Sequence, residues 1–130
     1  MRLLGIDYGE KKVGLAISDD KGMMAFPHSV MRNDKKMFEA VTKIARDEKV
    51  SRIIVGDSLD YKNQPNIIME KIRPFTEALK AVGFDVIFET ELLSSHQAAH
   101  FQGKTDMIDA AAASIILQSY IDREKHKNQN

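Results

Sequence analysis

Two strand-like runs lie at the start of the chain, separated by only three residues. The runs are Arg2–Tyr8 and Lys12–Ser18, and the link between them is Gly9-Glu10-Lys11. A glycine-containing connection this short is typical of a β-hairpin, so the two runs should pair antiparallel. The chain therefore begins as an antiparallel sheet, to which every later element has to attach.

A third strand extends this hairpin into a meander. Residues 23–31 form a strand-like run, although Pro27 restricts it to a sheet edge because proline cannot donate a ladder hydrogen bond. In the second strand, bulky residues alternate with the small residues Gly14, Ala16 and Ser18. One face of that strand should therefore admit a close neighbour.

The hydrophobic period then becomes helical. Asn33-Asp34 can cap a helix whose apolar positions are Met37, Val41, Ile44 and Ala45. Residues 52–56, Arg-Ile-Ile-Val-Gly, are typical of a strand buried on both faces of a parallel sheet. A second helix should span about 68–82, with Pro74 kinking or splitting it and Gly83 ending it.

The remaining elements complete an α/β domain. They are a short fifth strand at 84–89, a helix from about Ser94 and a longer helix from about Asp106 to Asp122. Three antiparallel strands followed by β-α units predict one mixed sheet with helices on both faces. We expect residues 1–122 to form a single domain, and the polar residues 123–130 to fray because they have nothing to bury.

Composition limits the classes of partner. The 130 residues contain 19 Lys and Arg and 19 Asp and Glu, so a polyanion has to be held by a local patch rather than by a global positive field. The chain has no cysteine, which excludes disulfides and thiolate metal sites. No apolar run approaches the ~20 residues of a membrane span. We therefore expect a soluble, cytoplasmic protein without a membrane partner.

Three carboxylates lie at positions where a purely structural role does not require them. Asp7 interrupts the apolar first strand, and Asp109 heads the apolar stripe of the last helix. Glu91 follows the fifth strand, in a loop of the kind where α/β sheets bind ligands, and Glu89 competes with it for this role. Taken singly, these residues could be a turn former, a helix-dipole partner and a solvated loop acid.

Taken together, the three acids predict a metal site. If the first, fourth and fifth strands run the same way, Asp7 and Glu91 emerge at one edge, where the helix that begins with Asp106–Asp109 can meet them. Carboxylates gathered in a partly dry site repel one another unless a cation neutralises them, and oxygen ligands select Mg²⁺ or Mn²⁺. Two such ions about 4 Å apart can promote phosphodiester cleavage.

Four segments carry a resemblance to a known family. They are GIDYGEKKVGLAISD (residues 5–19), IIVG (53–56), ELLSSHQA (91–98) and DAAAASIILQSYI (109–121). In this order, across nearly the whole chain, they resemble the YqgF (RuvX-like) family of pre-16S ribosomal RNA nucleases, which are similar in fold to ribonuclease H and to Holliday-junction resolvases. The resemblance implies a ribonuclease H-like fold, divalent-metal-dependent hydrolysis and an acidic triad of Asp7, Glu91 and Asp109.

The chain departs from the family pattern at two places. The family usually has Asp-Glu-Arg-Leu-Thr-Thr where this chain has Thr90-Glu91-Leu92-Leu93-Ser94-Ser95, so the central acid is kept and the arginine that follows it is absent. The usual Gly-Leu-Pro after the fourth strand is Gly56-Asp57-Ser58. Loss of a planar arginine weakens a phosphate contact, so these changes affect substrate handling more than metal binding.

Other polar residues have two interpretations each. Lys11, Lys12 and Lys104 can guide a backbone phosphate or belong to ordinary solvated turns, and Ser94 and Ser95 can donate to a phosphate or cap a helix. His96 and His100 have a zinc-compatible spacing but no evident third ligand. Asp106 can cap the last helix or contact the metal.

Three functions compete on this basis. The first is an endonuclease with two Mg²⁺ or Mn²⁺ ions that processes the 5′ end of pre-16S rRNA, acting on a pre-ribosomal particle as a monomer or weak homodimer. A DNA-junction resolvase uses the same chemistry. The second is a catalytically silent nucleic-acid-binding module. The third, a sugar-kinase-like or actin-like ATPase, requires a second domain for which 130 residues leave no room.

Overall fold

A computed structural model describes the backbone of residues 1–57, 67–90 and 106–128, and the side chains of residues 1–56, 70–89 and 110–127. Its strands are β1 (Arg2–Tyr8), β2 (Lys12–Ser18), β3 (Ala25–Arg32), β4 (Val50–Asp57) and β5 (Val86–Thr90). Its helices are α1 (Met37–Asp47), α2 (Ile67–Ala81) and α4 (Asp106–Asn128).

These strands form one mixed sheet in the order β3-β2-β1-β4-β5. The pairs β1–β2 and β2–β3 are antiparallel, whereas β4 runs parallel to β1 and β5 parallel to β4. The predicted meander followed by two parallel strands is confirmed, and β3 lies at an edge as Pro27 requires.

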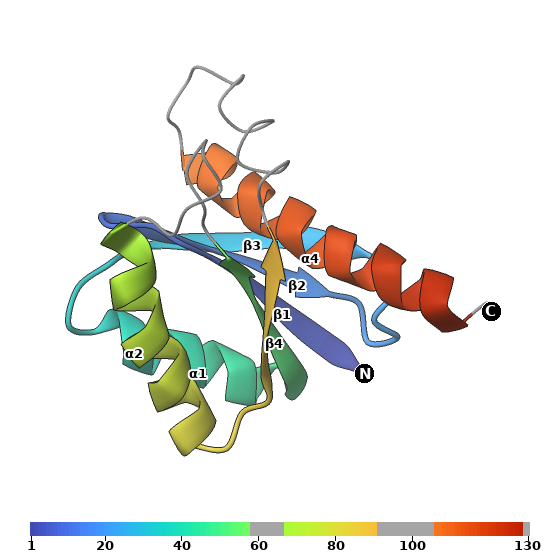
Figure 1. Cartoon of the computed structure of the whole chain (residues 1–130), viewed down its shortest axis with the longest axis horizontal. Coiled ribbons are helices and arrows are strands. Elements are labelled where there is room, and N and C mark those ends of the chain that lie inside the picture. The colour runs from blue at the N-terminus through green and yellow to red at the C-terminus, as the bar shows by residue number, and fades with distance from the viewer. Residues whose placement is uncertain (58–66, 91–105, 129–130) are drawn as a thin grey trace.

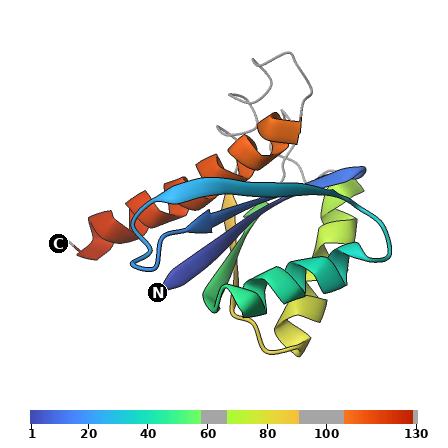
Figure 2. The same ribbon diagram turned by 180° about the vertical axis from the view of Figure 1, so that it is seen from behind.

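Helices cover both faces of the sheet, as predicted. Figure 1 shows α1 and α2 together below the sheet and α4 crossing above it, and Figure 2 shows the same three layers from behind. The core is correspondingly in two parts. On the α1–α2 side it includes Leu4, Ile6, Val13, Leu15, Val41, Ile53, Val55, Ile72 and Leu79. On the α4 side it includes Leu3, Ala16, Ile54, Ala113, Ile116, Leu117, Tyr120 and Ile121.

The small residues of β1 and β2 let α4 approach the sheet closely. A Cβ atom added to Gly5 would lie 2.7 Å from Leu117 Cβ and 3.0 Å from the carbonyl oxygen of Ala113. Ala16 of β2 is fully buried in the same cluster. The close neighbour predicted for the small face of β2 is therefore helix α4.

Two predicted helix ends were wrong, the start of α1 and the end of α4. Lys36, not Asn33 or Asp34, is the N-cap of α1, and it makes no side-chain cap bond. Asp34 instead accepts a hydrogen bond from the Lys36 backbone N–H (2.9 Å), so its side chain closes the turn before the helix. Helix α4 runs to Asn128 rather than ending at Asp122. Of the two effects predicted for Pro74, splitting of α2 does not occur, because the helix continues through this residue.

Tertiary contacts explain why α4 is longer than predicted. Lys125 Nζ donates to the carbonyl oxygen of Met23 (3.1 Å), and Gln118 Oε1 accepts from the Ala25 backbone N–H (2.8 Å). The Lys125 contact holds the helix against the β2–β3 connection after its apolar stripe has ended. Gly83 ends α2 as predicted, with φ of 103° and hydrogen bonds from Gly83 N to Lys80 O and from Phe84 N to Leu79 O.

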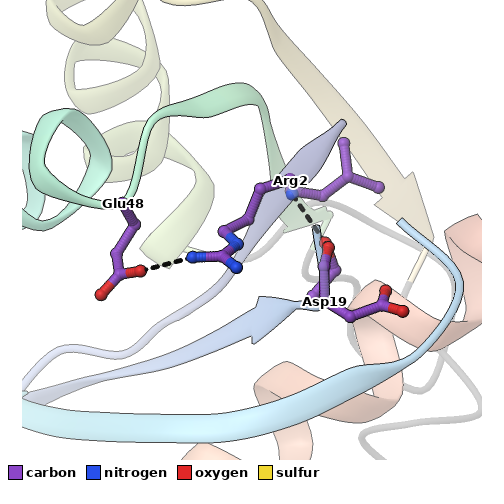
Figure 3. Close-up of polar contacts among 5 residues, drawn as sticks. Arg2, Asp19 and Glu48 are labelled. Carbon is purple, nitrogen blue, oxygen red and sulfur yellow. Dashed lines mark hydrogen bonds and ion pairs between the residues drawn. The ribbon is translucent and has the colours of Figure 1, made fainter. Parts of the chain in front are cut away.

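Polar contacts fix both sides of the start of β1 (Figure 3). Arg2 Nη1 pairs with Glu48 Oε2 at 2.7 Å, which joins β1 to the end of α1. The Leu3 backbone N–H donates to Ser18 Oγ at 2.8 Å. Backbone N–H groups of Met23 and Met24 donate to the Asp19 carboxylate and lower the pKa of Asp19 below its usual range. No helix in the described ranges is long and apolar enough to cross a membrane.

Candidate functional site

Asp7 lies next to the end of β1, on the face of the sheet that α4 covers. Strand alternation establishes this side, because Leu3 and Gly5 contact the α4 layer whereas Ile6 lies in the opposite core cluster. The residue is half-buried, and its partner in β2 is Gly14. The carboxylate is therefore attached to a central strand of the sheet, and the residue directly opposite it on β2 is a glycine.

The parallel strands end beside Asp7. Ile6 pairs with Val55, and Val55 pairs with Phe88, so β1, β4 and β5 advance in step to the same edge. Asp57 and Thr90 are the last pair of this ladder. The edge predicted to gather the acids is thus formed by the carboxyl ends of three neighbouring strands.

The other two predicted ligands are only partly covered by the structure. The backbone of Asp109 lies in the first turn of α4, one turn before Ala113, while its side chain lies outside the described part. Glu91 follows Thr90 directly and lies outside the described residues, as do Ser94, Ser95, His96, His100 and Lys104. Among the side chains that the structure does describe, no three acids or histidines come together as a metal site.

Glu89 has a structural partner that the sequence did not reveal. Its side chain is only 4% exposed; Oε2 accepts a hydrogen bond from Ser119 Oγ (3.0 Å) and Oε1 lies 2.5 Å from Arg123 Nη2. These partners lie one turn apart in the middle of α4, far from the helix start. Glu89 therefore joins β5 to α4. The available sequence signal was an acid that directly follows the apolar residues Val86–Phe88 within one strand.

The hairpin carries the basic residues predicted to contact substrate. Lys11 and Lys12 are exposed and line a pocket of about 680 Å³ together with Glu10, Val30, Met31, Arg32 and Asn33. Asn33 Nδ2 donates to the carbonyl oxygen of Gly9 (2.8 Å), and the Asn33 backbone N–H donates to that of Lys11 (2.8 Å). Arg32 and Asn33 were not predicted as part of this surface, because only the β2–β3 pairing brings them beside the hairpin.

A second pocket, of about 350 Å³, lies at the opposite end of the sheet. Its main polar feature is Arg52, whose Nε donates to Asp85 Oδ2 (2.6 Å) and whose Nη1 donates to the hydroxyl of Tyr120 (2.6 Å). The bonds to Asp85 and then Tyr120 raise the pKa of Arg52. This cluster joins β4 to the chain just before β5 and to α4, and it contains none of the predicted site residues.

Sequence comparison identifies relatives of the same length. Residues 1–123 match the family described as "RuvX: Holliday junction resolvase". A protein of Sulfurihydrogenibium sp. (strain YO3AOP1) is 32% identical over 137 residues, covering 98% of this chain and 94% of the relative. A protein of Natranaerobius thermophilus is 33% identical over 142 residues, covering all of both chains. Both carry the name "Putative pre-16S rRNA nuclease".

Structure comparison finds the same architecture in resolvases. Thermus thermophilus RuvC, solved in complex with a Holliday junction substrate, superposes with a TM-score of 0.63 at 14% identity, covering 96% of each chain. The fowlpox virus resolvase, solved with Holliday junction DNA, gives a TM-score of 0.60 at 15% identity, covering 95% of this chain and 98% of the resolvase. The fold is ribonuclease H-like, as the sequence resemblance implied, and the chain belongs to the RuvX (YqgF) family.

Proposed function

We propose that this protein is a divalent-metal-dependent nuclease that hydrolyses phosphodiester bonds, with the 5′ region of precursor 16S rRNA as its substrate. Full-length relatives named for this activity support the proposal, as does membership of the RuvX family. The observation that carries it is the position of Asp7. This half-buried carboxylate lies at the carboxyl ends of the parallel strands of the mixed sheet, where ligands bind in open α/β folds.

Helix packing supports the pairing of Asp7 with Asp109. Gly5 lies against Ala113 and Leu117, which fixes the relative positions of β1 and α4. The next residue on the same face of β1 is Asp7, ~6.7 Å further along the strand. One turn back from Ala113 is Asp109, ~6 Å nearer the helix start. Leu3, before Gly5 in β1, lines a pocket together with Tyr120, after Leu117 in α4, so β1 and α4 run antiparallel. The step from Gly5 to Asp7 and the step from Ala113 back to Asp109 therefore point toward the same end of the sheet.

The proposed donors suit a hard divalent cation. Asp7, Asp109 and Glu91, which directly follows β5, would supply carboxylate oxygens, which favour Mg²⁺ or Mn²⁺ over softer metals. Such an ion, when bound, supplies positive charge that activates a water molecule and stabilises the leaving oxygen. The protein's own part is to hold the three carboxylates at a sheet edge and to position the scissile phosphate. We propose Asp7, Glu91 and Asp109 as the ligands, and Glu89 as a residue that supports them.

Cleavage of branched DNA is the second candidate, because the matching family is described as a Holliday junction resolvase. The same carboxylates would perform the same chemistry on either nucleic acid. Leu92 and Asp57 depart from the family pattern at positions that affect how the substrate is held. For this reason a nucleic-acid-binding protein without catalytic activity is the alternative to both nucleases.

One assay separates these functions. The wild-type protein, Asp7→Asn and Asp109→Asn are incubated with a 16S precursor 5′ segment or with a four-way DNA junction, in Mg²⁺, Mn²⁺ or EDTA. Asp47→Asn, at an exposed position on α1, is the matched control. We expect metal-dependent RNA cleavage that falls at least ~100-fold in both site variants, since even an outer-shell partner of a metal ligand is worth about 10–100-fold.

The possible outcomes are distinct. Cleavage that Asp7→Asn and Asp109→Asn leave unchanged would contradict the proposed site. Cleavage of the junction but not of the RNA would assign the protein to DNA resolution. Binding without cleavage in every metal would favour the silent module.

A further inference from the structure

We propose that Lys12 and Arg32 form a backbone-phosphate subsite that holds the nucleic acid beside the proposed cleavage centre. The inference rests on the proposed function, and it names a residue, Arg32, that the family resemblance did not suggest. Its basis is the pairing of β2 with β3 and the pocket that this pairing creates.

The two cations are direct cross-strand neighbours. Lys12 of β2 pairs with Arg32 of β3, and the next pairs are Val13 with Met31 and Gly14 with Val30. Like charges at directly opposed positions of a sheet repel each other, and an anion bound between them offsets this repulsion. Both residues are exposed and line the same pocket, whose described lining has Lys11 as a third cation and Glu10 as its one acid. The pocket lining therefore carries a net positive charge, which suits an anionic ligand.

The pair lies on the same face of the sheet as Asp7. Val13 and Met31 belong to the core on the α1–α2 side, so Lys12 and Arg32, one position along, face the α4 side. Asp7 pairs with Gly14, which is the next residue after Lys12 on this face. The Lys12 backbone is therefore displaced from that of Asp7 by ~6.7 Å along the strands and ~4.8 Å across them.

Hydrogen bonds between the hairpin and β3 make this surface rigid. The Asn33 side chain donates to Gly9 and its backbone N–H donates to Lys11, while the Gly9 N–H donates to the carbonyl oxygen of Lys12 (2.9 Å). The turn that carries Lys11 is thus joined to the residue after Arg32. A cationic pair on a fixed backbone can hold a phosphate at a constant distance from Asp7, which is what positioning a scissile bond requires.

A nucleic-acid backbone fits this surface better than a small anion does. Lys12 and Arg32 form a row across the sheet from β2 to the edge strand β3. The neighbouring row on the same face is Asp7, Gly14 and Val30, and its central residue has no side chain. A chain of regularly spaced phosphates can occupy such a surface, with one phosphate at the acids and a neighbouring one at Lys12 and Arg32. The protein touches only the sugar-phosphate backbone in this arrangement, so binding should not depend on base sequence.

The test measures binding without metal, so that it does not depend on cleavage. The probe is a labelled RNA stem-loop in EDTA, titrated at several salt concentrations with wild-type protein, Arg32→Gln and the double variant Lys12→Gln/Arg32→Gln. The matched control is Arg73→Gln, an exposed arginine on α2 at the other face of the sheet. We expect the slope of log K against log salt to fall by about 0.7–0.9 for each phosphate that the variant no longer neutralises.

The wild-type protein and Arg73→Gln should have equal affinity and equal salt slopes, while Arg32→Gln should bind several-fold more weakly at low salt. An unchanged slope in both site variants would overturn the subsite, even if Asp7→Asn abolishes cleavage. A reduced slope would support it even if no metal restores cleavage, so the two proposals fail separately. Thermal unfolding of Arg32→Gln should occur no earlier than that of the wild type, because the substitution removes a like-charge pair.

Discussion

Single residues determine how closely the two halves of the proposed site can approach. Gly5 and Asp7 lie on the same face of β1, and the first has no side chain because Ala113 and Leu117 occupy that space. Asp7 lies two residues further along β1, in the direction of the first turn of α4. The absence of one side chain and the presence of a charge two residues later are therefore parts of the same packing arrangement.

Gly5→Ala should destabilise the protein and impair cleavage together. The new methyl would meet Leu117 Cβ at 2.7 Å and the Ala113 carbonyl oxygen at 3.0 Å, so α4 has to shift away from β1. Overpacking of this kind costs about 1–3 kcal/mol in unfolding free energy. Urea denaturation and the cleavage rate at saturating RNA would measure the two effects.

Gly83→Ala provides the control for that experiment. Gly83 has φ of 103° and nothing within 4 Å of an added Cβ, so alanine there is strained without displacing a neighbour. The expected loss is about 1–2 kcal/mol, with cleavage unchanged. Equal cleavage rates in the two variants would show that the β1–α4 distance does not govern the site.

At the scale of elements, the contacts of Glu89 with Ser119 and Arg123 join β5 to α4. The strand leads directly to Glu91, and the helix begins with the turn that contains Asp109. A buried carboxylate held by Ser119 and Arg123 therefore joins the two elements that would carry two of the three proposed ligands.

Arg123→Ala should destabilise the fold by about 1–3 kcal/mol, because it removes the positive partner of a buried carboxylate. Adding Glu89→Gln should restore part of that loss, since the amide needs no counter-ion. Lys127→Ala removes an exposed pair with Glu124 on the same helix and should change stability by less than about 1 kcal/mol. Chemical denaturation of the four proteins measures all these effects; equal losses in Arg123→Ala and Lys127→Ala would contradict the structural role of Glu89.

Local patterns predicted the elements, and tertiary contacts account for what they did not predict. The bounds of β1 and β2 were predicted to the residue, because a short hairpin and alternating side chains are local signals. The end of α4 was wrong because Lys125 is held by Met23, about a hundred positions earlier in the chain. The position of Asp7 at the carboxyl end of β1 was predictable from the sequence. The partners of Glu89 and the pairing of Arg32 with Lys12 were not, because they depend on strand and helix packing that no local pattern contains.

For the whole molecule, charge distribution matters more than net charge. Lys and Arg together equal Asp and Glu in number, so nucleic acid cannot be attracted by overall charge. The fold places charges of opposite sign side by side: Asp7 lies at the carboxyl ends of the parallel strands, and the adjoining hairpin and the end of β3 present Lys11, Lys12 and Arg32. A local row of cations can therefore hold an anionic chain beside Asp7 although the protein has no net positive charge.

The most direct test of the metal site is Mn²⁺ binding, followed by loss of the free-ion signal in electron paramagnetic resonance. The wild-type protein should bind Mn²⁺, and Asp7→Asn, Glu91→Gln and Asp109→Asn should each weaken that binding at least tenfold, with Asp47→Asn unchanged. Acids from β1, from the residue after β5 and from the start of α4 would then share one ion. Mn²⁺ binding that is the same in all five proteins would contradict the account.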